Sequence, residues 1–122
     1  MVSALFDTNV IIDFFRGYEP ARQELHRFER RLISVVTRME VLVGSSPESD
    51  GPVRRFLATF EAVPLDEEVI EAAITLRRER RIKLPDAIVW ASARTRSAIL
   101  VSRNTKDFPA DDPGVRVPYF LS

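Results

Sequence analysis

Four acidic residues stand at the end of an apolar run or at the start of a helix-like segment, and they are the residues of this chain most suited to chemistry: Asp7, Glu40, Asp86 and Asp107. In an open parallel α/β sheet, such junctions gather at the carboxyl ends of the strands, where ligands bind. Oxygen ligands of this kind suit a hard cation such as Mg²⁺ or Mn²⁺ rather than Zn²⁺. The sequence therefore predicts a metal site suited to phosphate chemistry.

Each acid also has a structural explanation. Asp7 is placed to end a strand or cap the following helix, and Asp86 lies in a first helical turn, where the helix dipole favours an acid. Thr37 and Glu40 have the spacing of a capping box. Asp107 belongs to a polar segment in which Asn and Asp favour a turn. These separate explanations leave the shared location of the four acids at one sheet edge unexplained.

The composition limits the class of protein. The 122 residues are 45% hydrophobic and 30% charged, with a formal net charge of zero, which predicts one globular domain over residues 1–122. The chain has no Cys and a single His, His26, so thiolate metal sites and a Cys nucleophile are excluded and catalysis by His is disfavoured. No segment resembles a transmembrane span or a signal peptide, so we expect a cytoplasmic protein without a membrane partner.

Strand-like and helix-like segments alternate along the chain. Apolar runs predict strands at 2–6, 32–36, 62–65, 98–101 and 115–117, and helical spacing predicts helices around 10–15, 20–30, 39–43, 53–60, 66–81 and 85–93. The segment 45–52 is rich in Ser, Pro, Asp and Gly and is expected to be a loop. This alternation favours an α/β fold with a parallel sheet covered by helices on both faces.

The helix expected at 66–81 has the most complete signals. Asp66 is suited to the N-cap, Leu65 and Ile70 have the spacing of a hydrophobic staple, and acidic residues precede basic ones along the segment. Pro85 is suited to the first turn of the next helix, whose nearly continuous apolar surface predicts a central position.

Four motifs, taken in order, resemble those of the PIN-domain ribonucleases, specifically the VapC toxins of bacterial toxin–antitoxin pairs. They are Leu5-Phe6-Asp7-Thr8-Asn9, Thr37-Arg38-Met39-Glu40, Leu84-Pro85-Asp86-Ala87-Ile88 and Val101-Ser102-Arg103-Asn104-Thr105-Lys106-Asp107-Phe108. The similarity spans the whole chain, and the order, spacing and total length make it specific. It implies a three-layer α/β/α PIN-like fold with a central, mainly parallel sheet of four to five strands.

The resemblance also implies an activity. Family members are endoribonucleases that use one or two Mg²⁺ or Mn²⁺ ions and cleave transfer or ribosomal RNA, which inhibits translation and growth. The metal and catalytic roles fall on Asp7, Glu40 and Asp86. Many relatives have an acid where this chain has Asn104, so either Asn104 or Asp107 is expected to complete the metal shell.

Further residues receive supporting roles from the same resemblance. It suggests that Thr8, Asn9 and Ser102 maintain the shape of the site through hydrogen bonds. A VapB-like antitoxin is expected to cover the acids, and a homodimer or a toxin–antitoxin hetero-oligomer is the expected assembly. The basic residues next to the motifs are candidates for contact with the RNA backbone, although exposed basic residues are common on any protein surface. They are Arg38, Arg103 and Lys106.

Other classes of protein fit less well. A haloacid-dehalogenase-like phosphatase needs a second Asp two residues after the first, where this chain has Asn9. A receiver domain needs its phosphoacceptor after the third strand, where Asp66 already serves as a helix cap. A catalytically inactive PIN-like module that binds RNA or protein stays open as an alternative, because Asn104 replaces an acid.

Overall fold

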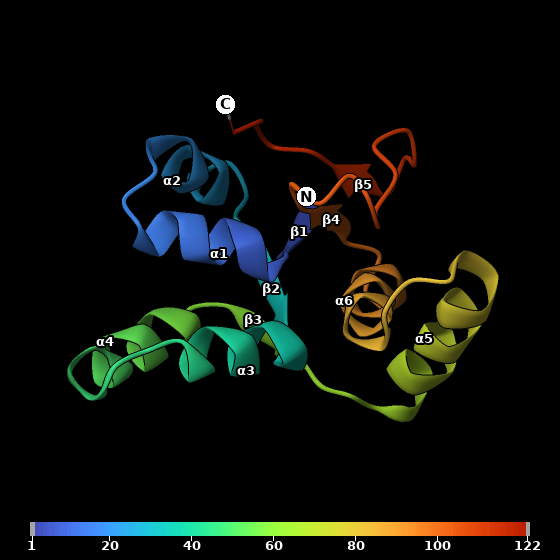
Figure 1. Ribbon diagram of the computed structural model, residues 1–122, viewed down its shortest axis with the longest axis horizontal. Helices are drawn as coiled ribbons and strands as arrows, with labels where there is room; N and C mark the ends of the chain where they lie inside the picture. Colours follow the sequence, from blue (N-terminus) through green and yellow to red (C-terminus); the bar gives the residue numbers. More distant parts are fainter. Residues whose placement is uncertain (1, 122) are drawn as a thin grey trace.

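A fully parallel five-stranded sheet lies at the centre of the computed structural model, which describes residues 2–121 (Figure 1). The strand order is β3-β2-β1-β4-β5. The strands are β1 (Ser3–Phe6), β2 (Arg30–Ser34), β3 (Glu61–Val63), β4 (Ile99–Val101) and β5 (Val115–Arg116). The predicted α/β fold with a parallel sheet is therefore confirmed.

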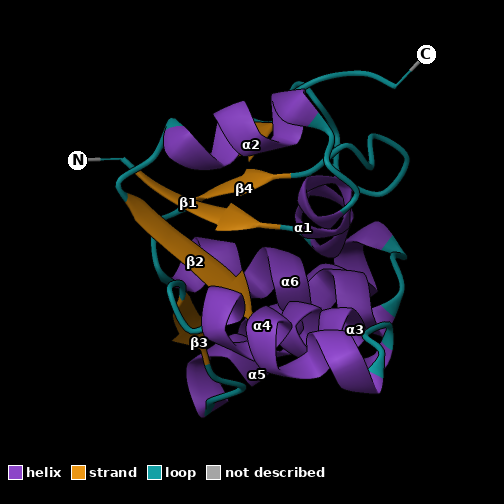
Figure 2. Cartoon of the chain, turned by 90° about the vertical axis from the view of Figure 1, so that its left-hand side faces the viewer, coloured by secondary structure: helices purple, strands orange, loops and turns teal. Residues whose placement is uncertain are grey.

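Within the described residues, six helices cover the two faces of this sheet. They are α1 (Thr8–Phe15), α2 (Glu19–His26), α3 (Val35–Val43), α4 (Pro47–Leu57), α5 (Glu67–Arg80) and α6 (Leu84–Thr95). Helices α5 and α6 lie together on one side of the sheet, and the other four helices lie on the opposite side (Figures 1 and 2). The chain thus forms three layers, with a separate apolar core on each face of the sheet.

The central strand β1 connects the two cores. Successive side chains of a strand point to opposite faces of the sheet. Leu5 accordingly packs in the core beneath α5 and α6, whereas its neighbours Ala4 and Phe6 pack in the core beneath the other helices. All four residues of β1 are buried. Burial on both faces explains why the strand is a continuous apolar run rather than an alternating one.

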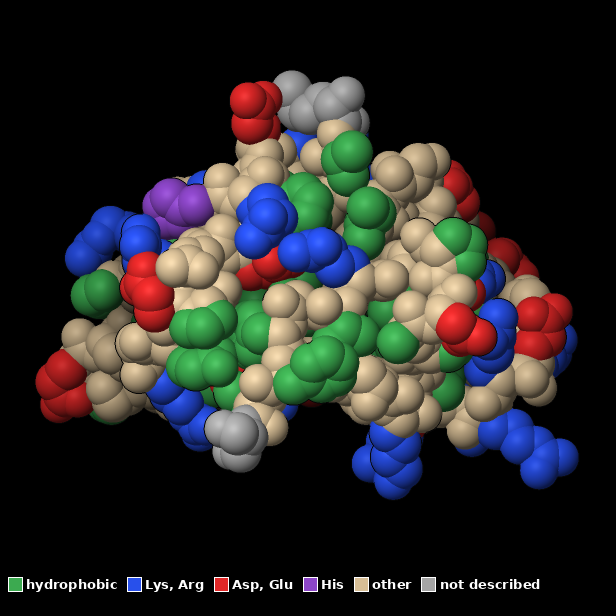
Figure 3. Space-filling view, turned by 90° about the horizontal axis from the view of Figure 1, so that it is seen from above, with side chains coloured by type: hydrophobic (Ala, Val, Ile, Leu, Met, Phe, Trp, Pro, Cys, Tyr) green, Lys and Arg blue, Asp and Glu red, His purple; other side chains and the backbone are tan. Residues whose placement is uncertain are grey.

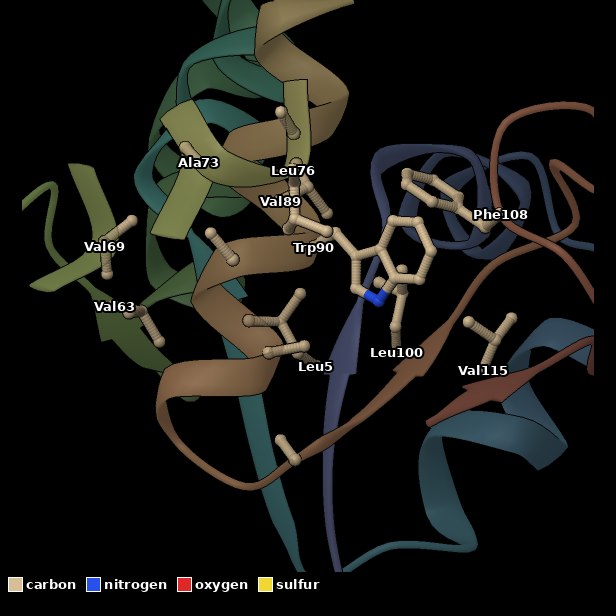
Figure 4. Packing of buried hydrophobic residues seen from close by; sticks show 14 of the residues in the cluster. Leu5, Val63, Val69, Ala73, Leu76, Val89, Trp90, Leu100, Phe108 and Val115 are labelled. Carbon is tan, nitrogen blue, oxygen red and sulfur yellow. The ribbon is translucent and has the colours of Figure 1, made fainter. Parts of the chain in front are cut away.

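Trp90 of α6 anchors the loop that follows β4. Its indole is buried and meets Phe108 edge to face, with the ring centroids 5.6 Å apart. Figure 4 shows the Trp90 ring close to Phe108 and to Leu100 of β4. Since Phe108 follows Asp107 directly, this contact fixes the loop residue next to one of the four acids.

Two expectations about the α3–α4 region are wrong. The strand predicted to reach residue 36 ends at Ser34, because the Ser34 side chain accepts a hydrogen bond from the Val36 amide and caps α3. Helix α4 begins at Pro47, within the segment expected to be a loop. Ser46 and Ser49 form a reciprocal capping box there, and Pro47 stands in the first turn, where its missing N–H is not needed.

The two strongest helix predictions are confirmed. Asp66 is the N-cap of α5 and accepts a hydrogen bond of 3.0 Å from the Val69 amide. Pro85 lies in the first turn of α6. None of the helices in the described part of the chain has the length and apolar character that a bilayer-spanning helix needs.

Charged side chains of both signs are interspersed over the face seen in Figure 3. Glu24 of α2 is among the acids that are instead buried. Its carboxylate accepts hydrogen bonds from Arg116 of β5 and from Arg27. A buried carboxylate is stable only while it is paired, so Arg116 ties the edge strand to α2.

We predict that Arg116→Met will lower the free energy of unfolding by about 3 kcal/mol, because it leaves the buried Glu24 charge with a weaker partner. The double variant Glu24→Gln/Arg116→Met should recover part of this loss, since a neutral amide costs less to bury. Urea denaturation of the wild type and both variants measures the two effects. Equal stability of the single and double variants would contradict this explanation.

Candidate active site

The candidate site lies where the strand order of the sheet reverses. Strands β2 and β3 continue the sheet on one side of β1, and β4 and β5 continue it on the other. A crevice forms at the carboxyl ends of the strands on either side of such a reversal, and ligands of α/β sheets bind there. Asp7 follows β1 directly and Ser102 follows β4. The fold thus places both residues at this crevice.

Asp7 is the most constrained of the four acids. It is buried and caps α1, with Oδ1 accepting a hydrogen bond of 2.8 Å from the Thr8 amide. Its Oδ2 accepts hydrogen bonds from Ser102 Oγ at 2.7 Å and from Asn9 Nδ2 at 3.3 Å. Burial raises the pKa of Asp7, while the hydrogen bonds from Ser102 and Thr8 oppose that rise. The capping role and a functional role are therefore compatible.

Glu40 reaches the site from α3. Its carboxylate accepts a hydrogen bond of 2.6 Å from the Thr8 hydroxyl, which lies 3.0 Å from the Thr37 hydroxyl. The capping box proposed for Thr37 and Glu40 is wrong, because Ser34 caps α3 and both residues lie inside the helix. Their spacing of three residues instead places both on the helix face that meets Thr8.

The pKa of Asp86 depends on its burial and on the other three acids. It lies in the first turn of α6 and is partly buried. Burial raises the pKa of Asp86 to about 6, and the neighbouring Asp7, Asp107 and Glu40 contribute to the same rise. The structure therefore brings Asp7, Asp107 and Glu40 within electrostatic reach of Asp86, although the four acids come from four different segments of the chain.

The turn after β4 holds Asp107 in place through Asn104. The Asn104 side-chain amide donates a hydrogen bond of 3.0 Å to Asp107 Oδ2, and its carbonyl accepts one of 3.3 Å from the Asp107 amide. The Asn104 backbone amide donates to Ser102 Oγ at 3.0 Å. Asn104 thus uses its side chain to orient the loop, and Asp107 is the group that interacts with Asp86.

Sequence reasoning missed Asp13, a buried acid of α1 one helical turn after Asn9. Asp13 accepts hydrogen bonds from the Arg103 guanidinium at 2.6 and 3.1 Å and from the Tyr119 hydroxyl at 2.8 Å. Burial alone would raise the pKa of Asp13, but these donors lower it overall. Arg103 also donates its backbone amide to Asn9 Oδ1 at 3.3 Å. The only sequence signal that could have pointed to Asp13 was its i,i+4 spacing from Asn9.

The three basic residues suggested for RNA contact have different surroundings. The Arg103 guanidinium is engaged by Asp13, which gives it a structural role. Arg38 is exposed on α3 and lines a pocket on the α4 side of the molecule. Lys106 is exposed and lines a pocket that also includes Asp107.

The donor set matches a hard divalent cation, because its ligand atoms are carboxylate oxygens with supporting hydroxyl and amide groups. Within residues 2–121, no group of three or more acids or histidines lies close enough together to hold a metal ion. Mutual repulsion between the carboxylates favours this separation.

Comparison with known proteins identifies the family. The model of the PIN domain matches residues 4–110. A chain of a toxin–antitoxin complex from Klebsiella pneumoniae is 42% identical, with 98% of this chain and 100% of that chain covered and a TM-score of 0.92. FitAcB from Neisseria gonorrhoeae is 25% identical, with 97% and 99% covered and a TM-score of 0.81.

DNA-bound VapBC from Salmonella typhimurium is also similar, with 25% identity, 95% of this chain and 96% of that chain covered and a TM-score of 0.78. No curated protein sequence gives a significant match. The family model spans most of the chain, and the VapBC resemblance extends over nearly its whole length. The chain therefore belongs to the PIN domain family, and it resembles proteins of toxin–antitoxin complexes, VapBC among them.

Proposed function

We propose that this protein is a metal-dependent endoribonuclease that acts as the toxin of a toxin–antitoxin pair and hydrolyses phosphodiester bonds of transfer or ribosomal RNA in the cytoplasm. The proposal is supported by the position of Asp86: beside the effect of its burial, Asp7, Asp107 and Glu40 each raise the pKa of this carboxyl. Four carboxylates in one crevice repel each other and are stable together when a divalent cation balances their charge.

Asp7 and Asp86 are the main proposed ligands of Mg²⁺ or Mn²⁺, Asp107 completes the shell, and Glu40 either binds the ion or orients the attacking water. A divalent ion bound there supplies positive charge for the scissile phosphate and activates water. Asp7 needs little reorganisation to act, because Ser102, Asn9 and the Thr8 amide already fix its orientation.

The Thr8 hydroxyl contributes a second constraint. It donates to Glu40 and thereby connects the start of α1 to the middle of α3. Rotation of Glu40 away from the crevice would break this hydrogen bond. Thr8 is therefore a positioning residue, which keeps Glu40 on the same side of the crevice as Asp7.

An antitoxin is the proposed partner, and a homodimer or a toxin–antitoxin hetero-oligomer is the proposed assembly. The solved relatives include toxin–antitoxin complexes, some of them bound to DNA. In this chain, a groove of about 440 Å³ adjoins Glu40 and is lined mainly by α1, α3 and α4, including Ile12, Phe15, Val41 and Val53. Such a groove suits an apolar segment that carries a basic residue toward the acids.

We predict that Asp7→Asn and Asp86→Asn will each reduce Mg²⁺-dependent cleavage of total cellular RNA by about 100-fold or more, because each removes a charge that the metal requires while preserving volume. The purified protein, free of antitoxin, is assayed with Mg²⁺, Mn²⁺ or EDTA, and circular dichroism checks that the variants are folded. Products that resist EDTA or both substitutions would overturn the mechanism. Folded wild type that cleaves no RNA would favour the inactive binding module.

A second prediction concerns stability in EDTA. The pKa of Asp86 is about 6 in the folded protein, above its usual value of 3.8, so the protein holds this proton more tightly when folded. The associated stability is present at low pH and is lost as the pH rises through about 6. Asp86→Asn should thus become more stable relative to wild type between pH 4 and pH 7.5. Urea denaturation at several pH values measures this difference, and a constant difference would contradict the assignment.

A further inference from the structure

A second pocket opens beside the acids, on the side of the crevice away from the apolar groove. It has a volume of about 330 Å³ and is lined by Arg80, Arg81, Ile82, Lys106, Asp107 and Pro109. Half of these residues are basic, and Asp107 also belongs to the acidic cluster. The pocket therefore joins a positively charged surface directly to the proposed catalytic centre.

The wall formed by the α5–α6 turn is unusually basic for this chain. Segment 77–83 contains five basic residues and one acid, while the whole protein has a formal net charge of zero. The basic residues are Arg77, Arg78, Arg80, Arg81 and Lys83. A local excess of this kind attracts anions at short range, even when the net charge of the protein does not.

Arg81 occupies a backbone position that usually selects glycine. It ends α5 in the left-handed conformation, with φ 55° and ψ 32°. Residues with a Cβ atom are disfavoured in this conformation, so arginine at this position lowers the stability of the folded protein relative to glycine. Its guanidinium forms no ion pair with any residue between 2 and 121, and the same is true of the Lys106 ammonium.

Arg80 is held more firmly in the same wall. Its guanidinium lies 5.0 Å from the centre of the Trp90 ring and 3.9 Å from Asp112. The Trp90 ring is itself fixed in the core against Phe108. Arg80 thus forms an ordered base for the pocket, while Arg81 and Lys106 keep their charges available to a ligand.

A phosphate chain that approaches four carboxylates needs nearby positive charge. Around this crevice, Arg103 is already neutralised by Asp13, and the pocket next to Glu40 is mainly apolar, with Arg16 as its one basic lining residue. The α5–α6 side offers Arg81 and Lys106, two cations that have no acidic partner among residues 2–121, together with Arg80, which is paired with Asp112. Arginine and lysine bind backbone phosphates without regard to base identity, which suits a contact that positions the RNA chain.

We propose that the pocket formed by Arg80, Arg81 and Lys106 binds backbone phosphates of single-stranded RNA next to the scissile bond. This inference rests on the proposed ribonuclease function and adds the path of the substrate. RNA enters or leaves the crevice over the α5–α6 turn, and the pocket contributes affinity rather than sequence selectivity.

The test measures RNA binding separately from cleavage. A fluorescein-labelled single-stranded RNA of 15 nucleotides is titrated with protein in EDTA at several salt concentrations, and a gel confirms that the RNA stays intact. The variants are Arg81→Gly, Lys106→Gln and their combination. Glycine suits the left-handed position, so Arg81→Gly removes the charge without destabilising the fold. Arg55→Gln is the matched control, because Arg55 is exposed on α4, on the opposite side of the sheet from α5 (Figure 1).

We expect the combined variant to bind RNA about tenfold more weakly than wild type. The slope of log affinity against log salt should fall by about 1.4, since each phosphate contact with a single strand contributes about 0.7. Arg55→Gln should bind within about twofold of wild type. Equal affinity of the combined variant and Arg55→Gln would overturn the proposal, as would equal competition by polyglutamate of the same charge.

Mg²⁺-dependent cleavage separates this proposal from the function on which it rests. Cleavage by wild type with no binding defect in the combined variant overturns the pocket assignment alone. A binding defect in a protein that cleaves no RNA supports the pocket and overturns the nuclease function. Wild type that neither binds nor cleaves RNA overturns both.

Discussion

Repulsion between the carboxylates at the candidate site is the interaction that the rest of the structure must counteract. Burial raises the pKa of Asp86, and Asp7, Asp107 and Glu40 add to this rise, so an ionised Asp86 carboxylate is unfavourable without compensation. The apolar cores on both faces of the sheet supply the stability that holds these segments in place. Hydrogen bonds from Ser102 and the Thr8 hydroxyl then fix individual carboxylates. The acids are thus kept together by the rest of the fold, and a divalent cation bound there would reverse the balance.

The two sides of the crevice differ in chemistry. Beside Glu40, the surface is grooved and mainly apolar, and next to Asp107 it is basic. An apolar groove suits a protein segment, whereas unpaired cations suit a polyanion. A protein segment in the groove and a polyanion on the basic side would compete at the acids, while each keeps its own flanking surface.

Much of the fold followed from the sequence because the signals were local. Asp66 and the proline at position 85 determine helix starts through single contacts, and strands buried on both faces appear as continuous apolar runs. The predictions failed where a nearby competitor was stronger: Ser34 caps α3 in place of Thr37, and the Ser46–Ser49 pair starts α4 inside a segment rich in turn residues. The four acids were singled out because each lies near the end of an apolar run or the start of a helix-like segment, and Asp7 directly follows β1. Asp13 was missed because its partners are 90 and 106 residues away, and no local pattern reports such contacts.

The same long separations determine when the site can exist during synthesis. The hydrogen bond from Ser102 to Asp7 joins residues 95 positions apart, and the Tyr119 contact with Asp13 spans 106. A ribosome that has completed β1, α1 and α3 has made Asp7 and Glu40 but none of the partners that β4 and the segment after it provide. Contacts this distant form only after nearly the whole chain has emerged. An unfinished or truncated copy of the protein therefore lacks an assembled site.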